Sequence, residues 1–262
     1  TLAALQASSI PEGLHVDILV VDNGSSDHTA DVVARAGADS PIPIHYHFEP
    51  TPGISHARNH ALSVLQAPLV LFTDDDCLPA KDWITRMVGL FVAQPELALV
   101  GGKVVLHNPL DSPVFTTHTD ERVVFAHGAD YLTYTIMGAN MAARASALAS
   151  VGAFDPALGA GSRARVAAED FDMVYRLVSA EFHVEFNPGP TVAHDHGRRL
   201  QSDVEHTLCQ AHAGVGAVVA KHGRGDRELV QRGYWTLKQF ARHGQWGYAY
   251  HFWRGVLSRL RA

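Results

Sequence analysis

Apolar runs and polar breaks alternate along the first hundred residues. The β-branched run at residues 16–21 in "LHVDILVVDNGSS" is typical of a strand, and "NGSS" interrupts it. A helix is expected over residues 28–36, with Asp27 or Ser26 as its cap and Gly37 closing it. "IPIHYHFEP" then predicts a second short strand, and "PGISHARNHALSVLQA" predicts a helix that begins after Pro-Gly.

The alternation continues to about residue 106. "PLVLFT" predicts a fully buried strand, and "LALVGGKVVL" predicts another. Between them, "PAKDWITRMVGLFVAQPE" predicts a helix with Trp83, Met87 and Phe91 on one face. Strands that alternate with helices of about 10–15 residues indicate a mainly parallel sheet covered on both faces. We therefore expect an α/β fold whose ligands bind beyond the carboxyl ends of the strands.

The second half of the chain is less regular. Residues 107–135 contain "NPLDSP" and several histidines, and they predict a long excursion from the sheet. "MGANMAARASALASVGAF" predicts a turn followed by a helix from about Ala143. The Gly/Ala/Ser-rich residues 159–168 predict a mobile segment that leads directly into another helix. "HVEFNPGPTVAHDHGRR" predicts a strand pair or a strand and a loop, and residues 202–222 predict a helix.

Length and composition fit one domain with an appendage. The chain has 262 residues, of which 47% are hydrophobic and 18% are charged, as in ordinary globular proteins. No apolar run approaches the ~20 residues that a membrane-spanning helix needs. We expect a main domain over residues 1–200 and a C-terminal helical extension over residues 201–262.

Charge is unevenly distributed along the chain. From Lys221 onward nine Lys and Arg face two acids, a balance of +7, while the rest has 12 basic and 25 acidic residues, a balance of −13. The acidic body argues against general nucleic-acid binding. The basic end is rich in Trp and Tyr, which suggests an anionic surface as a partner.

Three adjacent carboxylates, those of Asp74, Asp75 and Asp76, follow the apolar run "LVLFT". Because they repel one another, something must compensate their charge. A helix N-terminus would favour acids, but the next helix is expected to begin near residues 79–81, and one acid would suffice as its cap. A divalent cation explains all three better, since Mg²⁺ and Mn²⁺ prefer carboxylate oxygens and leave positions open for phosphates.

Three further polar side chains follow the first strand or begin the second helix. Asp22 either forms a local turn or accepts hydrogen bonds from a ribose or a base edge. Asp27 allows the same two interpretations, as a helix cap or as a ligand group. Arg58 is either a surface arginine or a guanidinium that binds phosphate and balances the acids.

Two more clusters are candidates for chemistry. Glu169 and Asp170 are either acids favoured by a helix N-terminus or a general base on a fixed helix beneath a mobile lid. His194 and His196 are two apart, so a strand would place them on one face. As a lone pair they are weak evidence for a metal, but with Asp76 nearby they would form a His/carboxylate site.

Six stretches in this order resemble the family 2 glycosyltransferases, nucleotide-sugar-dependent enzymes with the GT-A type fold. They are "ILVVDNGSSDHTADVV", "PGISHARNHAL", "LVLFTDDDCLP", "MGANMAARASALASVGAFDPALGAG", "EDFDMVYRL" and "TVAHDHG". Together they extend over residues 16–198, about two-thirds of the chain. The resemblance implies a Rossmann-like sheet flanked by helices.

The resemblance also assigns ligand contacts. The residues implied at the nucleotide are Asp22, Asp27, Arg58, Asp74 and Asp75, although the role of Asp75 is not fixed. Asp76 would be the direct ligand of Mn²⁺ or Mg²⁺ in the DxD motif, and His194 would be an additional metal ligand.

The resemblance places the reaction on the later motifs. Asp170 would be the general base for the acceptor hydroxyl, with Glu169 beside it. Gly138, Ala139 and Asn140 would line the donor-sugar or acceptor pocket. A sugar would pass from a nucleotide-diphosphate sugar, with UDP favoured, to a glycan, lipid-linked or small-molecule acceptor. A base opposite the leaving group would give inversion, although a retaining enzyme is not excluded.

Family members usually begin with a strand of the "VSVVIPTYN" kind, which is missing ahead of "TLAALQASSIPEGLH". Two other function classes remain open. A nucleotidyltransferase would share the sheet, and a non-catalytic nucleotide-sugar-binding protein would keep the fold without the reaction.

The C-terminal residues repeat large apolar side chains every three or four positions. The apolar members are Trp246, Tyr250, Trp253, Leu257 and Leu260, flanked by Arg242, Arg254, Arg259 and Arg261. The pattern predicts either a helix packed on the domain or on a second subunit, as in a homodimer, or a basic amphipathic helix on a membrane surface within residues 227–262. The cysteines, Cys77 and Cys209, form no CxxC pair, so we expect a cytoplasmic protein, with placement at the inner face of the membrane as the alternative.

Overall fold

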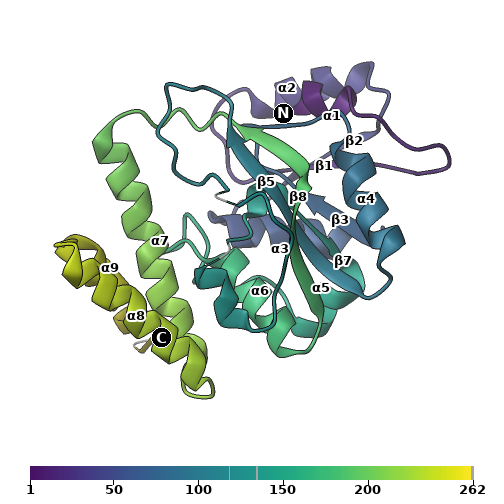
Figure 1. Cartoon of the computed structure of the whole chain (residues 1–262). Helices are drawn as coiled ribbons and strands as arrows, with labels where there is room; N and C mark the ends of the chain where they lie inside the picture. The colour runs from purple at the N-terminus through teal and green to yellow at the C-terminus, as the bar shows by residue number, and fades with distance from the viewer. Residues whose placement is uncertain (118, 134, 261–262) are drawn as a thin grey trace.

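The structure is a computed structural model that describes residues 1–117, 119–133 and 135–260. Figure 1 shows a central sheet with helices on both sides and a group of C-terminal helices on one flank. Arg261 and the side chain of Leu260, which belong to the predicted C-terminal pattern, lie outside the described residues.

The N-terminal part forms a small sheet of its own. Strand β1 (Ile18–Asp22) pairs in parallel with β2 (Ile44–Phe48). Helix α2 (Thr29–Ala38) connects them, and α3 (Ile54–Val64) follows β2. A short helix α1 (Leu2–Gln6) precedes β1. This strand–helix–strand order is the predicted one, although α2 begins at Thr29 and includes Gly37.

The larger sheet has the order β3-β7-β5-β8-β4, and β6 pairs with β8 outside this path. Its strands are β3 (Leu69–Phe72), β4 (Cys77–Pro79), β5 (Leu97–Leu106), β6 (Val123–Val124), β7 (Met141–Arg144) and β8 (His183–His194). The α/β class is confirmed, but the directions of the strands differ from the prediction of a mainly parallel sheet. In this larger sheet β5 and β8 are parallel, whereas the pairs β3–β7, β5–β7, β4–β8 and β6–β8 are antiparallel.

The difference arises where the chain omits a crossover helix. Only a four-residue connection, residues 73–76, separates β3 from β4, and β7 follows the excursion over residues 107–135 without a long helix. Parallel neighbours need a crossover, usually helical, so these strands pair in the antiparallel sense. Strand β3 lies at one end of the sheet order, and its first three residues are half-buried rather than fully buried.

The core lies on both faces of the larger sheet. Helix α4 (Trp83–Ala93) contributes the predicted face of Trp83, Met87 and Phe91, all buried in one cluster with Val100 of β5. Helices α5 (Ala145–Val151) and α6 (Glu169–Ser179) belong to the other cluster, which includes Leu99. Successive residues of one strand, Leu99 and Val100, thus point to opposite faces.

Residues 138–151 differ from their prediction. Short 3₁₀ helices η1 (Gly128–Leu132) and η2 (Gly138–Asn140) precede β7, and the helix α5 begins at Ala145, not near Ala143. Ala142 and Ala143 are fully buried between β3 and β5. Tertiary packing here overrides the helix preference of an alanine-rich run.

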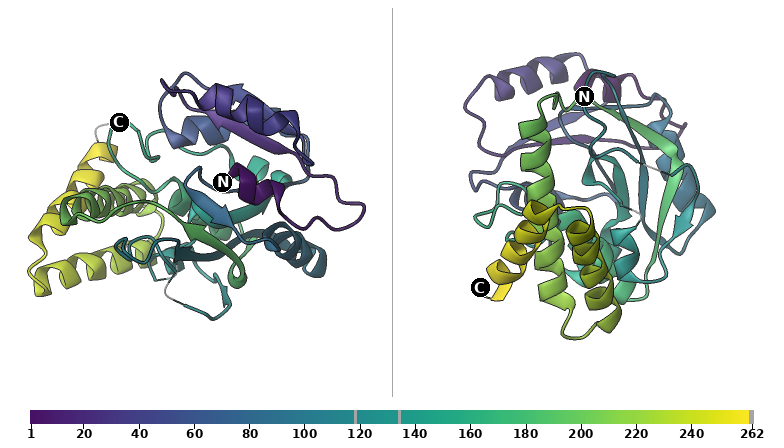
Figure 2. Two further views of the ribbon diagram at one scale, coloured as in Figure 1. Left: turned by 90° about the horizontal axis from the view of Figure 1, so that it is seen from above. Right: turned by 60° about the vertical axis from the view of Figure 1, so that its left-hand side comes forward.

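The C-terminal helices are α7 (Gln201–His222), α8 (Arg227–Arg242) and α9 (Trp246–Leu260). Figure 2 shows them together on one flank of the sheet domain. Helices α7 and α9 approach closely at glycines, because a Cβ at Gly216 would overlap the carbonyl of Phe252 and a Cβ at Gly255 would overlap that of Ala213. None of the helices in the described part of the chain is long and apolar enough to cross a bilayer.

Candidate active site

Arg58 of α3 is only 7% exposed and contacts two of the predicted acidic residues. Its Nη1 donates a hydrogen bond to Oε1 of Glu169 at 2.8 Å, and its Nη2 lies 3.8 Å from Oδ1 of Asp74. The rings of Phe72 and Phe154 lie 5.9 and 5.5 Å from its guanidinium carbon. Burial alone would lower the pKa of Arg58, but the nearby carboxylates, Glu169 foremost, outweigh burial and raise it.

Arg58 is therefore not a surface arginine, and its guanidinium pairs with two carboxylates. The second of the two interpretations holds in part: the guanidinium balances the acids. Truncating such a buried partner leaves an uncompensated charge, which typically costs about 3–5 kcal/mol.

Glu169 and Asp170 begin α6 and have different surroundings. Glu169 is buried, and burial, with the neighbouring Asp170 charge, raises its pKa to about 7 although Arg58 opposes the shift. Asp170 is half-buried; its Oδ1 accepts from the N–H of Phe171 at 2.7 Å and its Oδ2 from the N–H of Gly138 at 3.3 Å. Of the two carboxylates, Asp170 is thus the one with accessible surface.

Gly138 and Tyr131 complete the surroundings of these acids. A Cβ at Gly138 would overlap Nη2 of Arg58, so only glycine fits this contact. The ring of Tyr131 stacks on Phe171 with centroids 4.5 Å apart, and its hydroxyl donates to the carbonyl of Ile136 at 2.8 Å. Burial, reinforced by the Asp170 charge, raises the pKa of Tyr131 well above its usual value. Sequence reasoning missed Tyr131, because nothing in residues 107–135 distinguishes it.

The three consecutive aspartates separate in space. Asp74 faces Arg58, Asp75 is exposed, and Asp76 pairs with His194 through Oδ1 and Nε2 at 3.2 Å. Burial raises the pKa of Asp74 despite the attraction of Arg58. The hydrogen bond from His194 lowers the pKa of Asp76. The mutual repulsion of the triplet is therefore relieved by partners in different directions.

Asp76, Cys77 and His194 form a group with metal-ligand character. Their ligand atoms lie within 4.8 Å of one another, because β4 and β8 pair with Cys77 opposite His194. Nδ1 of His194 is buried and has no hydrogen-bond partner within the described part of the chain. Burial raises the pKa of Cys77 to about 12, so at neutral pH its thiol is protonated and a poor ligand.

This donor set fits a divalent cation. The carboxylate of Asp76 and the imidazole of His194 are suitable ligands for Mn²⁺. The imidazole also has a buried nitrogen, Nδ1, without a hydrogen-bond partner in the described residues. The predicted combination of Asp76 with His194 is therefore present. The ring of His196 lies 5.1 Å from that of His194, but His196 is near Asp111 rather than Asp76.

Asp22 forms the local turn that was one of its alternatives, whereas Asp27 makes a local hydrogen bond without being the predicted cap, since the N-cap of α2 is His28. Asp22 ends β1 and accepts from the N–H of Ser25 and the hydroxyl of Tyr46, both at 2.8 Å. Burial would raise the pKa of Asp22, but these hydrogen bonds prevail and lower it. Asp27 accepts from the N–H of Thr29 at 3.0 Å, at the first residue of α2. Neither is joined to Arg58 or Asp74 by a hydrogen bond or ion pair in the described residues.

The structure contradicts the predicted pocket-lining role of Asn140. Its side chain is fully buried; Oδ1 accepts from Nε1 of Trp83 at 2.7 Å, and Nδ2 donates to the carbonyls of Lys103 and Pro190 at 2.9 and 3.1 Å. Because a buried amide must satisfy its hydrogen bonds, Asn140 instead ties α4, β5 and β8 together. Ala139 is also buried, at 5% exposure, so of the three predicted residues Gly138 is the one that contacts the acidic group.

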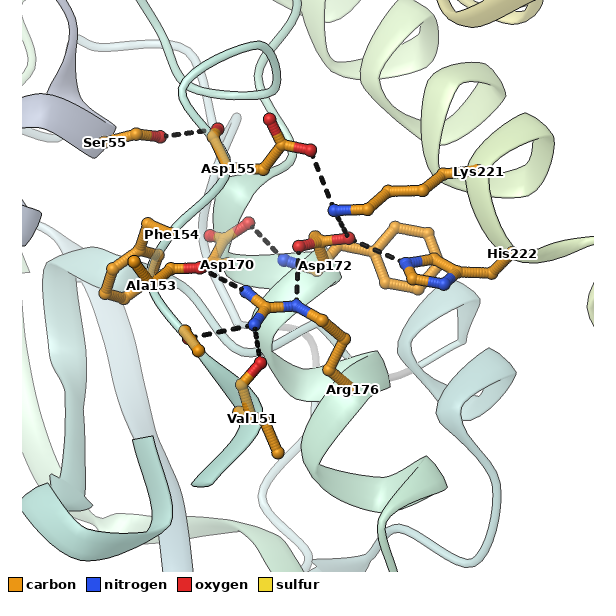
Figure 3. A network of polar contacts seen from close by, with 12 residues as sticks. Ser55, Val151, Ala153, Phe154, Asp155, Asp170, Asp172, Arg176, Lys221 and His222 are labelled. Atoms are coloured by element: carbon orange, nitrogen blue, oxygen red, sulfur yellow. Dashed lines mark hydrogen bonds and ion pairs between the residues drawn. The ribbon is translucent and has the colours of Figure 1, made fainter. Parts of the chain in front are cut away.

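A second polar network, centred on Asp172, anchors α6 from behind (Figure 3). The fully buried Asp172 pairs with Nε of Arg176 at 2.8 Å, Nζ of Lys221 at 2.8 Å and Nε2 of His222 at 2.7 Å. Burial would raise the pKa of Asp172, but these three partners lower it to about 2. Arg176 also donates to the carbonyls of residues 151–153. Two of the partners lie on α7, so a C-terminal helix neutralises a charge on the helix that carries Glu169 and Asp170.

Comparisons with known proteins show that the chain is similar to glycosyltransferases. The model of a family described as glycosyl transferase family 2 matches residues 1–147. The pre-mycofactocin glycosyltransferase of Mycobacterium tuberculosis is 29% identical over 194 residues, which cover 70% of this chain and 38% of that protein. The succinoglycan biosynthesis protein ExoM of Rhizobium meliloti is 32% identical over 88 residues, which cover 34% of this chain and 28% of that protein. The chain thus spans well under half the length of these curated relatives.

Solved structures show the same architecture. The mannosyltransferase PcManGT of Pyrobaculum calidifontis, in complex with GDP-Man and Mn²⁺, superposes with a TM-score of 0.68 at 16% identity, covering 99% of this chain and 81% of its own. S. aureus TarS in complex with UDP-GlcNAc gives a TM-score of 0.58 at 17% identity, covering 86% of this chain and 68% of its own. At these identities the likeness shows the fold alone, and that fold is the one predicted from the sequence.

Proposed function

The chain belongs to glycosyl transferase family 2, and from that premise we propose that it transfers a sugar from a nucleotide-diphosphate sugar to an acceptor hydroxyl with inversion. A UDP-sugar is the favoured donor, and the acceptor is a glycan, a lipid-linked sugar or a small molecule. The observation that carries the proposal is the group of Asp74, Arg58 and the Glu169–Asp170 pair beside the Asp76–His194 pair.

Asp170 is the proposed general base. Its carboxylate is half-buried and held by the N–H groups of Phe171 and Gly138, so it has a fixed direction and an accessible surface. An acceptor hydroxyl is a poor nucleophile, and a carboxylate within hydrogen-bond reach takes its proton as it attacks. Glu169 is committed to Arg58 and acts on Asp170 through charge.

Asp76 and His194 are the proposed holders of a divalent cation, Mn²⁺ or Mg²⁺. When bound, the cation supplies positive charge for the diphosphate that leaves with the nucleotide. The proposed nucleotide contacts are Asp22, Asp27, Asp74 and Asp75. The proposed role of Arg58 is to keep Glu169 and Asp74 close together despite their like charges, because its guanidinium lies between them.

A thermal-shift assay followed by a transfer assay tests the proposal. UDP, GDP and dTDP should be added with and without Mn²⁺, and at least one nucleotide should raise Tm more when Mn²⁺ is present, since a ligand that binds the folded state stabilises it. Asp170→Asn should lower transfer by about 10²–10⁴-fold and leave the nucleotide-dependent shift in place.

The exposed carboxylate of Asp31 on α2 offers the matched control, and Asp31→Asn should leave both readings unchanged. Absence of any nucleotide-dependent shift would contradict the donor class. Loss of the shift in Asp170→Asn would contradict the role of Asp170, and nucleotide binding without transfer for any donor would favour a non-catalytic binding protein.

A further inference from the structure

Helix α9 has two opposite faces, and one of them is packed. Tyr248, Phe252 and Gly255 follow a spacing of four and three residues, which keeps them on one side of a helix. Phe252 is 2% exposed, and Gly255 lies so close to Ala213 of α7 that a Cβ would overlap its carbonyl. This side of α9 therefore packs on α7, although it is not the side that the sequence pattern predicted to pack.

The aromatic stripe predicted from the sequence is not on that side. Trp246, Tyr250, Trp253 and Leu257 are 67%, 66%, 54% and 48% exposed. Their spacings of four, three and four residues place them in one row, about opposite the packed row. We call these four residues the aromatic face. Exposed aromatic rows of this kind mark interaction sites, because isolated exposed apolar residues are common but contiguous ones are not.

The neighbouring helix α8 adds exposed aromatic and basic side chains. It buries Leu229 and Phe240, while Tyr234 and Trp235 are exposed. Nζ of Lys238 lies 5.4 Å from the ring centroid of Trp235. Figure 2 shows α8 and α9 together with α7 on one flank of the molecule.

Charge on these helices selects the kind of partner. The segment from Lys221 onward has nine Lys and Arg against two acids. Three of these cations, Lys221, Arg232 and Arg259, pair with carboxylates of the rest of the chain. Arg224, Arg227, Lys238 and Arg242 are exposed on or beside α8. A second copy would bring two segments of the same positive sign together, which is repulsive, whereas an anionic lipid surface attracts each of these cations.

The side chains on the aromatic face also favour lipid. Trp and Tyr prefer the boundary between headgroups and acyl chains, where a ring is apolar and its N–H or O–H remains hydrated. We propose that the aromatic face of α9 rests on a membrane surface that contains anionic lipid, with the helix parallel to that surface. The described helices cannot cross the bilayer, so the contact is peripheral.

Vesicle co-sedimentation tests this surface directly and requires no substrate. The probe is vesicles of phosphatidylcholine with phosphatidylserine, compared with phosphatidylcholine alone, at low salt and at about 0.5 M salt. The protein should pellet with the mixed vesicles, and high salt or omission of phosphatidylserine should weaken its binding. A blue shift of the tryptophan fluorescence should accompany binding.

The double variant Trp246→Ser/Trp253→Ser should reduce partitioning by about tenfold or more, because two interfacial anchors are removed. Its matched control is Val92→Ser on α4, where Val92 is 75% exposed, and this variant should bind as the parent does. An unchanged Tm of the double variant shows that α9 still packs on α7. The double variant Lys238→Gln/Arg242→Gln should weaken binding to the vesicles that contain phosphatidylserine and leave binding to phosphatidylcholine vesicles unchanged.

Two outcomes would overturn the proposal. One is a failure of the vesicle assay: either the parent protein does not pellet with anionic vesicles, or the double variant pellets with them to the same extent as the parent. The other is a dimer in sedimentation velocity that the double variant dissociates while vesicles bind neither protein, because the aromatic face would then be an interface between two copies.

Discussion

At the residue scale, a single buried guanidinium organises the acids. Arg58 lies beside the paired rings of Phe72 and Phe154 and is paired with Glu169 and Asp74. Gly138 is tightly packed against it, and a side chain there would displace the Arg58 terminus. The glycine therefore matters because of its neighbour and not because of its own backbone conformation.

Gly138→Ala is expected to push Arg58 away from Glu169 and to lower kcat by about tenfold or more, since displacement of a buried ionic partner is costly. The variant should also melt at a lower temperature. A matched control is Gly89→Ala in α4, where a Cβ would meet nothing within 4 Å; alanine in a helix should there stabilise by about 0.5–1 kcal/mol. Equal activity and stability of the two variants would contradict the close contact.

The raised pKa of Glu169, about 7, predicts an acid limb in the activity profile. Below pH 7 Glu169 takes up a proton and its ion pair with Arg58 is lost. Arg58 then keeps Asp74 as its ion-pair partner, and the loss of the Glu169 charge beside Asp170 makes proton abstraction there less favourable. We expect kcat/KM, measured from pH 5.5 to 8.5, to fall as pH drops through about 7. Glu169→Gln should be slow and lack this limb; an identical limb in the variant would assign it to another group.

At the element scale, α6 is held at both ends of its first turn. Glu169 is bound to Arg58 of α3 in front, and Asp172 is bound to Lys221 and His222 of α7 behind. The sequence predicted the beginning of this helix, because acids follow a Gly/Ala/Ser-rich run. It did not predict the anchor from α7, since nothing local links Asp172 to a residue about fifty positions later.

Asp172→Asn should destabilise the fold by about 3 kcal/mol at pH 7, because it removes the buried carboxylate that pairs with Arg176 and Lys221. The pKa of Asp172 is about 2 in the folded state, against an ordinary value of 3.8. Its contribution to stability is therefore complete above about pH 4 and is lost as pH falls toward 2. Urea unfolding at pH 7 and pH 3 should show a smaller difference between variant and parent at the lower pH. A difference that does not change with pH would mean that packing, not charge, is responsible.

The misplaced elements have a common physical origin. The short run Met141–Arg144 is alanine-rich and reads as helix, yet burial between two strands makes it β7. Asn140 was predicted to line a pocket, yet its side chain lies in the core, where it forms hydrogen bonds with Trp83 and with two backbone carbonyls. Long periodic elements such as α4 and β5 were predicted well because many residues agree on one period. The conformation of short elements such as β7 is instead determined by packing against residues that are distant in the sequence.

At the scale of the whole molecule, the opposite charges of body and tail meet at the Asp155 carboxylate. Lys221 of α7 pairs with it at 2.8 Å, and Arg259 of α9 pairs with it as well. The carbonyl of the same residue accepts from the hydroxyl of Ser55 on α3 at 3.0 Å. The boundary near residue 200 stays a prediction, but these bonds connect both sides of it.

Body and tail should consequently unfold in one cooperative transition. Replacing Trp235, Trp246 and Trp253 by Phe leaves Trp83, buried in α4, as the fluorescent reporter of the body. Its urea transition should coincide with that of far-UV circular dichroism, which reports all helices. Two separate transitions would show that the helical extension folds independently of the sheet domain.

The position of these cations in the chain also has a consequence for synthesis. Asp172 is made some fifty residues before Lys221 and His222, and Asp155 about a hundred residues before Arg259. A chain that leaves the ribosome N-terminus first must therefore keep both carboxylates hydrated until α7 and α9 arrive. The helix that begins with Glu169 and Asp170 can be buried in its final place only after most of the chain has been translated.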